Sequence, residues 1–103
     1  MYKIEILPIA KKDMDDIIYY IHNSLKNYTA SKKMKDLFLK SLDYISEFPY
    51  GNSVYEVLGT LKNEYRRHKI KNFLIFYVIN EDEKIITIVR VLYQKMNITN
   101  ILK

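Results

Sequence analysis

The stretch YRRHKIKNFLIFYVINEDEKIITIVRVLYQK, at residues 65–95, decides the fold of this chain. Two runs within it, residues 73–79 and 85–93, are rich in β-branched and aromatic residues, which favours strands at this length. The polar break between the runs is short, so they are predicted to form an antiparallel hairpin. In residues 73–79 side chains of both parities are apolar, which predicts a strand covered on both faces.

The residues before this stretch supply helices that can cover such a strand. Residues 2–7 are predicted to form a short strand, ended by Pro8, and residues 9–25 a helix. A second helix is predicted to begin after Thr29 as N-cap and to end at the turn over residues 48–52. The short connection predicts an antiparallel αα-hairpin. The side chains predicted to face the core are Met14, Ile17, Ile18, Ile21, Leu25, Met34, Leu37, Phe38, Leu42 and Ile45.

The remaining segments complete the predicted sheet. An edge strand is predicted at residues 54–58, a loop at 59–63 and a cationic strand at 64–70. The tail, residues 94–103, fits either a short helix or an extended arm. The resulting order is β-α-α-β-β-β-β in a single domain, residues 1–103. Because helices and strands are segregated, the predicted class is α+β, with a mainly antiparallel sheet and the αα-hairpin on one face.

Composition limits the classes of function. The chain of 103 residues has a formal net charge of +5, which favours polyanionic or acidic partners. It contains no cysteine, so disulfides and thiolate metal sites are excluded. Its longest apolar run is far below the roughly 20 residues that a membrane helix needs, and its start does not resemble a signal peptide. We therefore expect a soluble, cytoplasmic protein with no metal or organic cofactor.

Four basic residues, 66–69, lie near the start of the stretch at residues 65–95. Alternation along a strand places Arg66 and His68 on one face and Arg67 and Lys69 on the other, so the four cannot all line one site. A cationic edge strand also discourages aggregation. Arg90 lies among apolar residues, and its structural interpretation is an ion pair with a helix carboxylate.

The first helix carries three acids in its first half, where the helix dipole favours negative charge. Asp13, Asp15 and Asp16 are interpreted as solvated acids rather than metal ligands. His22, near the end of this helix, is interpreted as a surface residue.

The chain resembles toxins of the RelE/ParE superfamily, the toxic halves of bacterial type II toxin–antitoxin pairs, over nearly its whole length. ParE-like members carry an Arg about eight residues before an L-I-F-Y core strand, here Arg66 before residues 74–77. They also carry an R-V-L-H-x-x-x-D motif near the end, here residues 90–97, with Tyr93 in place of the His and Asn97 in place of the Asp. The resemblance is closer to the ParE-like branch and implies a RelE-like fold.

This resemblance implies alternative mechanisms. ParE-like members poison DNA gyrase without catalytic residues of their own, and the contact candidates here are Arg66, Arg90, Tyr93 and Lys95. RelE-like members cut messenger RNA in the ribosomal A site, but they carry an Arg where this chain has Leu74. Gyrase poisoning is the favoured expectation, and a third alternative is an inactive basic binding module. If the chain is instead an endoribonuclease, its candidate catalytic groups are His68 as base, Arg66, Arg67 and Arg90 as phosphate clamps, and Tyr93 as stacking platform or proton donor.

All alternatives share an implied partner, a small acidic antitoxin that adds a strand or lays a helix across the αα-hairpin. The candidate contacts are Tyr19, Tyr20, Leu39 and Tyr44, which also suit the rim of a small core. The resemblance implies that the complex represses its own operon, with operator DNA bound only through the antitoxin.

Overall fold

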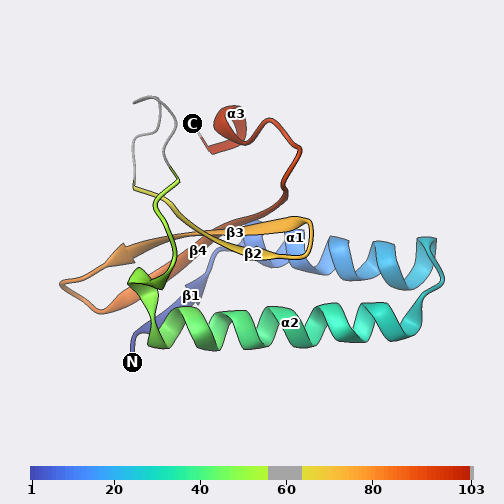
Figure 1. Cartoon of the computed structure of the whole chain (residues 1–103), viewed down its shortest axis with the longest axis horizontal. Coiled ribbons are helices and arrows are strands. Elements are labelled where there is room, and N and C mark those ends of the chain that lie inside the picture. Colours follow the sequence, from blue (N-terminus) through green and yellow to red (C-terminus); the bar gives the residue numbers. More distant parts are fainter. Residues whose placement is uncertain (56–63, 103) are drawn as a thin grey trace.

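The computed structural model of the chain describes residues 1–55 and 64–102. The predicted α+β architecture and the order of its helices and strands are confirmed (Figure 1). Within the described residues, none of the helices is long and apolar enough to cross a membrane. The elements are β1 (Lys3–Ile6), α1 (Pro8–Tyr19), the π-helical turn η1 (Tyr20–Ser24), α2 (Tyr28–Glu47), the 3-10 turn η2 (Pro49–Gly51), β2 (Arg66–Ile70), β3 (Phe73–Asn80), β4 (Ile85–Tyr93) and α3 (Ile98–Leu102).

The four named strands form one sheet in the order β1-β4-β3-β2. β3 pairs antiparallel with both β2 and β4, whereas β1 runs parallel to β4. Of the edge strand predicted at residues 54–58, Val54 forms an isolated bridge with Arg66. Residues 56–58, and the loop predicted at 59–63, lie outside the described residues. β3 is therefore an inner strand, as its apolar sequence predicts.

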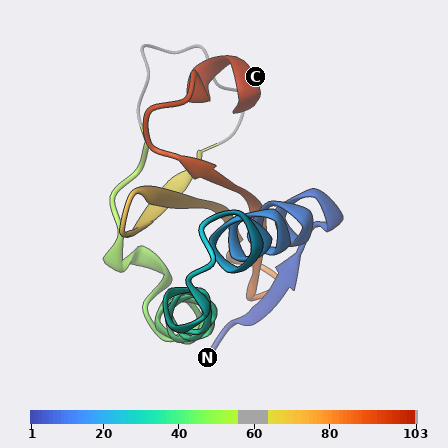
Figure 2. The same cartoon turned by 90° about the vertical axis from the view of Figure 1, so that its right-hand side faces the viewer.

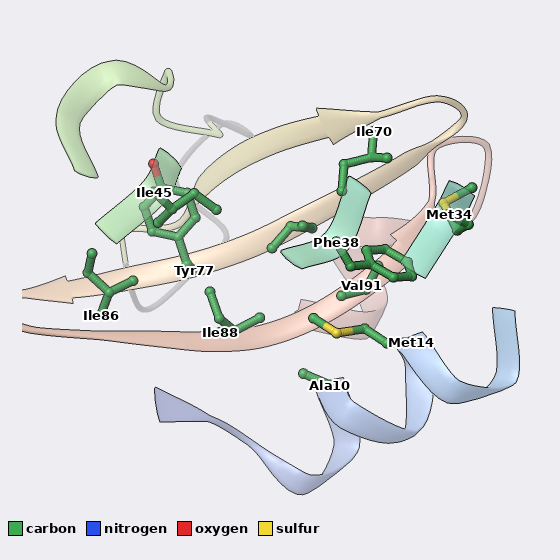
Figure 3. Packing of buried hydrophobic residues seen from close by; sticks show 11 residues of the cluster. Ala10, Met14, Met34, Phe38, Ile45, Ile70, Tyr77, Ile86, Ile88 and Val91 are labelled. Carbon is green, nitrogen blue, oxygen red and sulfur yellow. The ribbon is translucent and has the colours of Figure 1, made fainter. Parts of the chain in front are cut away.

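Both faces of β3 are covered, as predicted. On one face Ile75 and Tyr77 join the larger core, which packs between the sheet and the two long helices (Figure 3). On the other face Leu74 and Phe76 pack in a second cluster with residues of α3. Figure 2 shows α1 and α2 side by side on one side of the sheet and α3 on the opposite side. Within the tail, residues 98–102 therefore form a short helix that covers the second face.

Two local predictions are wrong. The N-cap of α2 is Asn27 rather than Thr29, and its side-chain oxygen accepts a hydrogen bond from the Ala30 N–H at 3.1 Å. Thr29 already lies in the first turn of that helix. Leu25, predicted to face the core, is 55% exposed because α1 passes into η1 before reaching it. The wider π-helical turn ends the 3.6-residue periodicity on which that prediction rested.

A polar cluster joins the start of the chain to the β3–β4 turn. Glu81 accepts hydrogen bonds from Lys84, from the Tyr2 hydroxyl at 2.7 Å and from the Tyr50 hydroxyl at 2.6 Å. These hydrogen bonds lower the pKa of Glu81 to about 2, and the bond from Lys84 has the largest effect. The cluster also fixes η2, which leads into the connection before β2.

Candidate functional site

A cleft of about 710 Å³ lies on the face of the sheet opposite α1 and α2. One wall is the connection that follows η2, another is β2, and the beginning of the tail closes the far side. Leu74 of β3 and Ile98 of α3 give it an apolar floor. The described lining residues are Gly51, Asn52, Ser53, Tyr55, Arg67, Lys69, Leu74, Gln94, Lys95 and Ile98.

Three exposed cations converge on this cleft: Arg67, Lys69 and Lys95. The Arg67 guanidinium lies 5.5 Å from the centre of the Tyr55 ring. Among the described lining residues there is no carboxylate and no imidazole, so nothing described in the cleft neutralises these charges. Fixed cations that lack counter-charges form a binding surface for anions, phosphate groups above all.

Of the four basic residues 66–69, the other two, Arg66 and His68, face the opposite side of β2, as the alternation predicts. The Arg66 guanidinium donates to the Asn52 carbonyl at 2.7 Å, and His68 Nδ1 lies 3.2 Å from the Asn52 side-chain oxygen. The Asn52 amide in turn donates to the Tyr77 hydroxyl at 3.2 Å, which donates to the Pro49 carbonyl at 2.7 Å. Burial lowers the pKa of His68. Arg66 and His68 thus hold the wall of the cleft and do not face into it.

Arg90 forms a two-pronged ion pair with Asp13 of α1. Its Nε lies 2.8 Å from Asp13 Oδ2 and its Nη2 3.0 Å from Oδ1, while the Val91 N–H also donates to Oδ2 at 3.0 Å. The predicted pairing of Arg90 with a helix carboxylate is confirmed. The interpretation of Asp13 as a solvated acid is wrong, since its side chain is only 14% exposed. The reason is that β1 pairs with β4 only as far as Ile88, so a carboxylate from α1 satisfies the strand edge beyond it. The other two acids of α1 are exposed, as predicted: Asp15 and Asp16.

The four residues predicted to contact a target do not form one site in the described structure. Of these, Lys95 lines the cleft, Arg66 binds Asn52 and Arg90 binds Asp13. Tyr93 packs edge to face against the Phe73 ring, with ring centres 5.9 Å apart.

The predicted ribonuclease set is divided in the same way. Only Arg67 of its five members lines the cleft, because His68, Arg66, Arg90 and Tyr93 have the contacts just described. Lys69, which also lines the cleft, was not among the predicted site residues, although it shares the strand parity of Arg67.

The four residues predicted to contact an antitoxin are exposed, but they lie on more than one surface. Leu39 lines an apolar groove of about 170 Å³ between α1 and α2. Tyr44 lies on another side of α2, where its ring centre is 5.4 Å from that of His68. Tyr19 and Tyr20 lie where α1 meets η1 and are 66% and 56% exposed.

Comparison with solved structures shows the fold of bacterial toxins. The chain is similar to the RelBE2 toxin–antitoxin complex from Mycobacterium tuberculosis, with a TM-score of 0.62, 12% identity and coverage of 89% of this chain and 96% of that chain. It is similar to the intact RelBE complex of E. coli, with a TM-score of 0.60, 13% identity and coverage of 93% and 100%. A metal-bound toxin from Helicobacter pylori has a TM-score of 0.60, 20% identity and coverage of 90% and 94%.

Comparison with family models identifies the family. Residues 4–98 match the model described as "ParE toxin of type II toxin-antitoxin system, parDE", so the chain belongs to this toxin family. The resemblance inferred from its sequence motifs is thereby confirmed. No curated protein matches the chain. In the part of the chain that the structure describes, no group of three or more His, Cys, Asp or Glu side chains could hold a metal ion.

Proposed function

We propose that this toxin poisons DNA gyrase by binding, with its cationic cleft against the phosphate backbone of the DNA that the enzyme holds. The observation that carries the proposal is the convergence of Arg67, Lys69 and Lys95 on one open cleft. Each cation that neutralises a phosphate releases condensed counterions, which favours association with DNA whatever its sequence. A toxin that traps an enzyme on cleaved DNA needs such fixed charges and no proton transfer of its own.

The composition of the cleft supports binding rather than cleavage. RNA cleavage through the 2′-hydroxyl needs a base for that proton and an acid for the leaving oxygen. The described lining residues include neither a carboxylate nor an imidazole, and the side chains there that could transfer a proton are Tyr55, Lys69 and Lys95. His68, the base in the ribonuclease alternative, lies on the face of β2 opposite Arg67 and contacts Asn52. The cleft floor carries Leu74, which cannot stabilise a developing negative charge.

We also propose that a small acidic antitoxin neutralises the toxin by laying an amphipathic helix in the groove between α1 and α2. Two of the similar solved structures are toxin–antitoxin complexes, which supports an antitoxin partner. The groove combines apolar side chains with Lys35 and with Lys11, which already pairs with Asp15 of the same groove, so a helix with an apolar stripe and an acidic flank beside Lys35 is complementary to it. Among the residues that line it are Lys11, Met14, Ile18, Lys35, Phe38, Leu39 and Leu42.

The test of gyrase poisoning is the accumulation of linear plasmid when antitoxin-free toxin is added to gyrase with ATP. Arg67→Gln and Lys69→Gln should each lower the yield about tenfold to a hundredfold, because a hydrogen bond to a charged group contributes roughly 1.5–3 kcal/mol. Lys3→Gln is the matched control. It removes the same charge from β1, at the opposite edge of the sheet, and should leave the yield unchanged.

Two results would contradict the proposal. One is the absence of linear plasmid at a toxin dose that arrests growth. The other is cleavage of messenger RNA on translating ribosomes that is lost in His68→Ala, because this result would assign His68 a catalytic function.

A further inference from the structure

A second group of cations lies where the β2–β3 turn meets α2. Lys71, in the left-handed region at φ 53°, occupies this turn. It lines a shallow pocket of about 270 Å³ together with Lys33, Lys40, Asp36 and Leu37 of α2. We call the three lysines Lys33, Lys40 and Lys71 the turn cluster. All three are exposed, and a single acid accompanies them among the described residues of this pocket.

The turn cluster is continuous with the cleft. Lys69 lines the cleft and is two residues from Lys71. The neighbouring turn residue, Asn72, accepts a hydrogen bond through its carbonyl from the N–H of Gln94 at 2.8 Å, and Gln94 also lines the cleft. Figure 1 shows the β2–β3 turn at the end of the sheet that points toward the α1–α2 connection. The positive surface of the cleft therefore continues over the end of the sheet onto α2.

We infer that the turn cluster is a second phosphate-binding surface, and that one DNA duplex contacts it and the cleft together. This inference rests on the proposed function, because it extends the same DNA contact. Arg67 and Lys69 are two residues apart on one face of β2, a separation of roughly 7 Å. That is about twice the axial spacing of phosphates along one DNA strand.

The residue types indicate what kind of contact the turn cluster makes. Lysine is a compact point charge that binds phosphate without the fixed two-pronged geometry of arginine. Contacts of this kind position a duplex but read no sequence. The turn cluster should therefore contribute affinity and salt dependence, and no preference among base sequences.

The salt dependence of the DNA-binding constant measures the number of phosphate contacts. For double-stranded DNA the slope of log K against log salt concentration is about −0.9 for each neutralised phosphate. If the three cleft cations and the three turn lysines all contact phosphates, the slope for a short duplex should be about −5. The triple variant Lys33→Gln, Lys40→Gln, Lys71→Gln should reduce it to about −3, as measured by fluorescence anisotropy in increasing KCl. Glutamine, like lysine, carries a Cβ atom, so Lys71→Gln does not alter the cost of the positive φ angle at position 71.

The control removes charge elsewhere. The double variant Lys3→Gln, Lys12→Gln alters exposed lysines of β1 and α1, and the one surface ion pair that it removes is worth little. It should keep the wild-type slope. A turn variant with the wild-type slope would overturn the inference, and so would a control variant whose slope falls equally. Tighter binding of a single-stranded RNA of equal length would overturn the assignment to duplex DNA.

The plasmid assay, run in parallel, separates this inference from the proposed function. If Arg67→Gln lowers the yield of linear plasmid as predicted while the turn variant keeps the wild-type salt slope, only the inference fails. If the wild-type toxin yields no linear plasmid, the proposed function fails, and the salt slopes still decide whether the turn cluster binds DNA.

Discussion

Replacing Asp13 by alanine should destabilise this protein much more than replacing the exposed acids of the same helix. The Asp13 carboxylate accepts two hydrogen bonds from Arg90 and one from the Val91 N–H, at 2.8 to 3.0 Å. The substitution leaves a partly buried guanidinium and a strand-edge N–H without their partner. It also removes a polar contact between α1 and β4, which stay packed through the apolar core.

The magnitude follows from the burial of the pair. Breaking a fully buried ion pair costs about 3–5 kcal/mol. Here the side chains of Asp13 and Arg90 are 14% and 24% exposed, so water can partly replace the lost contacts. We therefore expect a loss of about 2–3 kcal/mol in the free energy of unfolding. For a domain of this size that corresponds to a fall in Tm of roughly 10–20 °C.

Urea denaturation followed by circular dichroism measures this loss, with Asp16→Ala as the control on the same helix. Asp16 also pairs with a lysine, at 2.7 Å, but its side chain is 64% exposed, so its removal should cost less than about 1 kcal/mol. In a double-mutant cycle, Asp13→Ala and Arg90→Ala should show a coupling of about 1 kcal/mol or more. Equal losses for Asp13→Ala and Asp16→Ala would refute the reasoning.

Three further predictions concern pH and buried polar groups. Hydrogen bonds, of which the one from Lys84 has the largest effect, hold the pKa of Glu81 at about 2 in the folded chain. Stability should therefore fall as the pH drops from about 4.3, the ordinary pKa of a glutamate, toward that value. Glu81→Gln should flatten this acid limb of Tm against pH, and the neighbouring control Asp82→Asn should not. Burial lowers the pKa of His68, so below about pH 6.5 the unfolded chain takes up a proton that the folded chain resists. Stability should decline there, and the decline should be smaller in His68→Gln. Tyr77→Phe removes a buried hydroxyl that both donates and accepts, and should cost about 1–3 kcal/mol in urea denaturation.

The local sequence was sufficient to predict the strands and to predict which of the basic residues 66–69 lie on each face of their strand. Residues 73–79 are apolar at every position, and this pattern requires cover on both faces wherever the strand lies. Strand alternation likewise separates Arg66 and His68 from Arg67 and Lys69 whatever the partners are. The N-cap was missed because Asn27 and Thr29 are both favourable capping residues, and the choice depends on backbone angles that propensity does not determine.

The contacts that could not be predicted join residues far apart in the chain. Asp13 and Arg90 are 77 positions apart, and their contact depends on where β1 ends beside β4. The convergence of Lys69 with Lys95 depends on a tail that folds back over the second face of the sheet. Composition indicates a basic protein, but only tertiary structure determines which cations share a surface.

The register of β2 connects the proposed mechanism to the core. To bring His68 into the cleft, β2 would have to slip by one residue, and such a slip moves every side chain of a strand to the opposite face. Ile70, which is 4% exposed in the larger core, would leave the helix side, and Lys69 would turn toward it. The same slip would remove Arg66 and His68 from Asn52, and with them the support of the cleft wall. The packing of Ile70 therefore stabilises the register that presents Arg67 and Lys69 to the cleft and keeps the imidazole out of it, as the proposed mechanism requires.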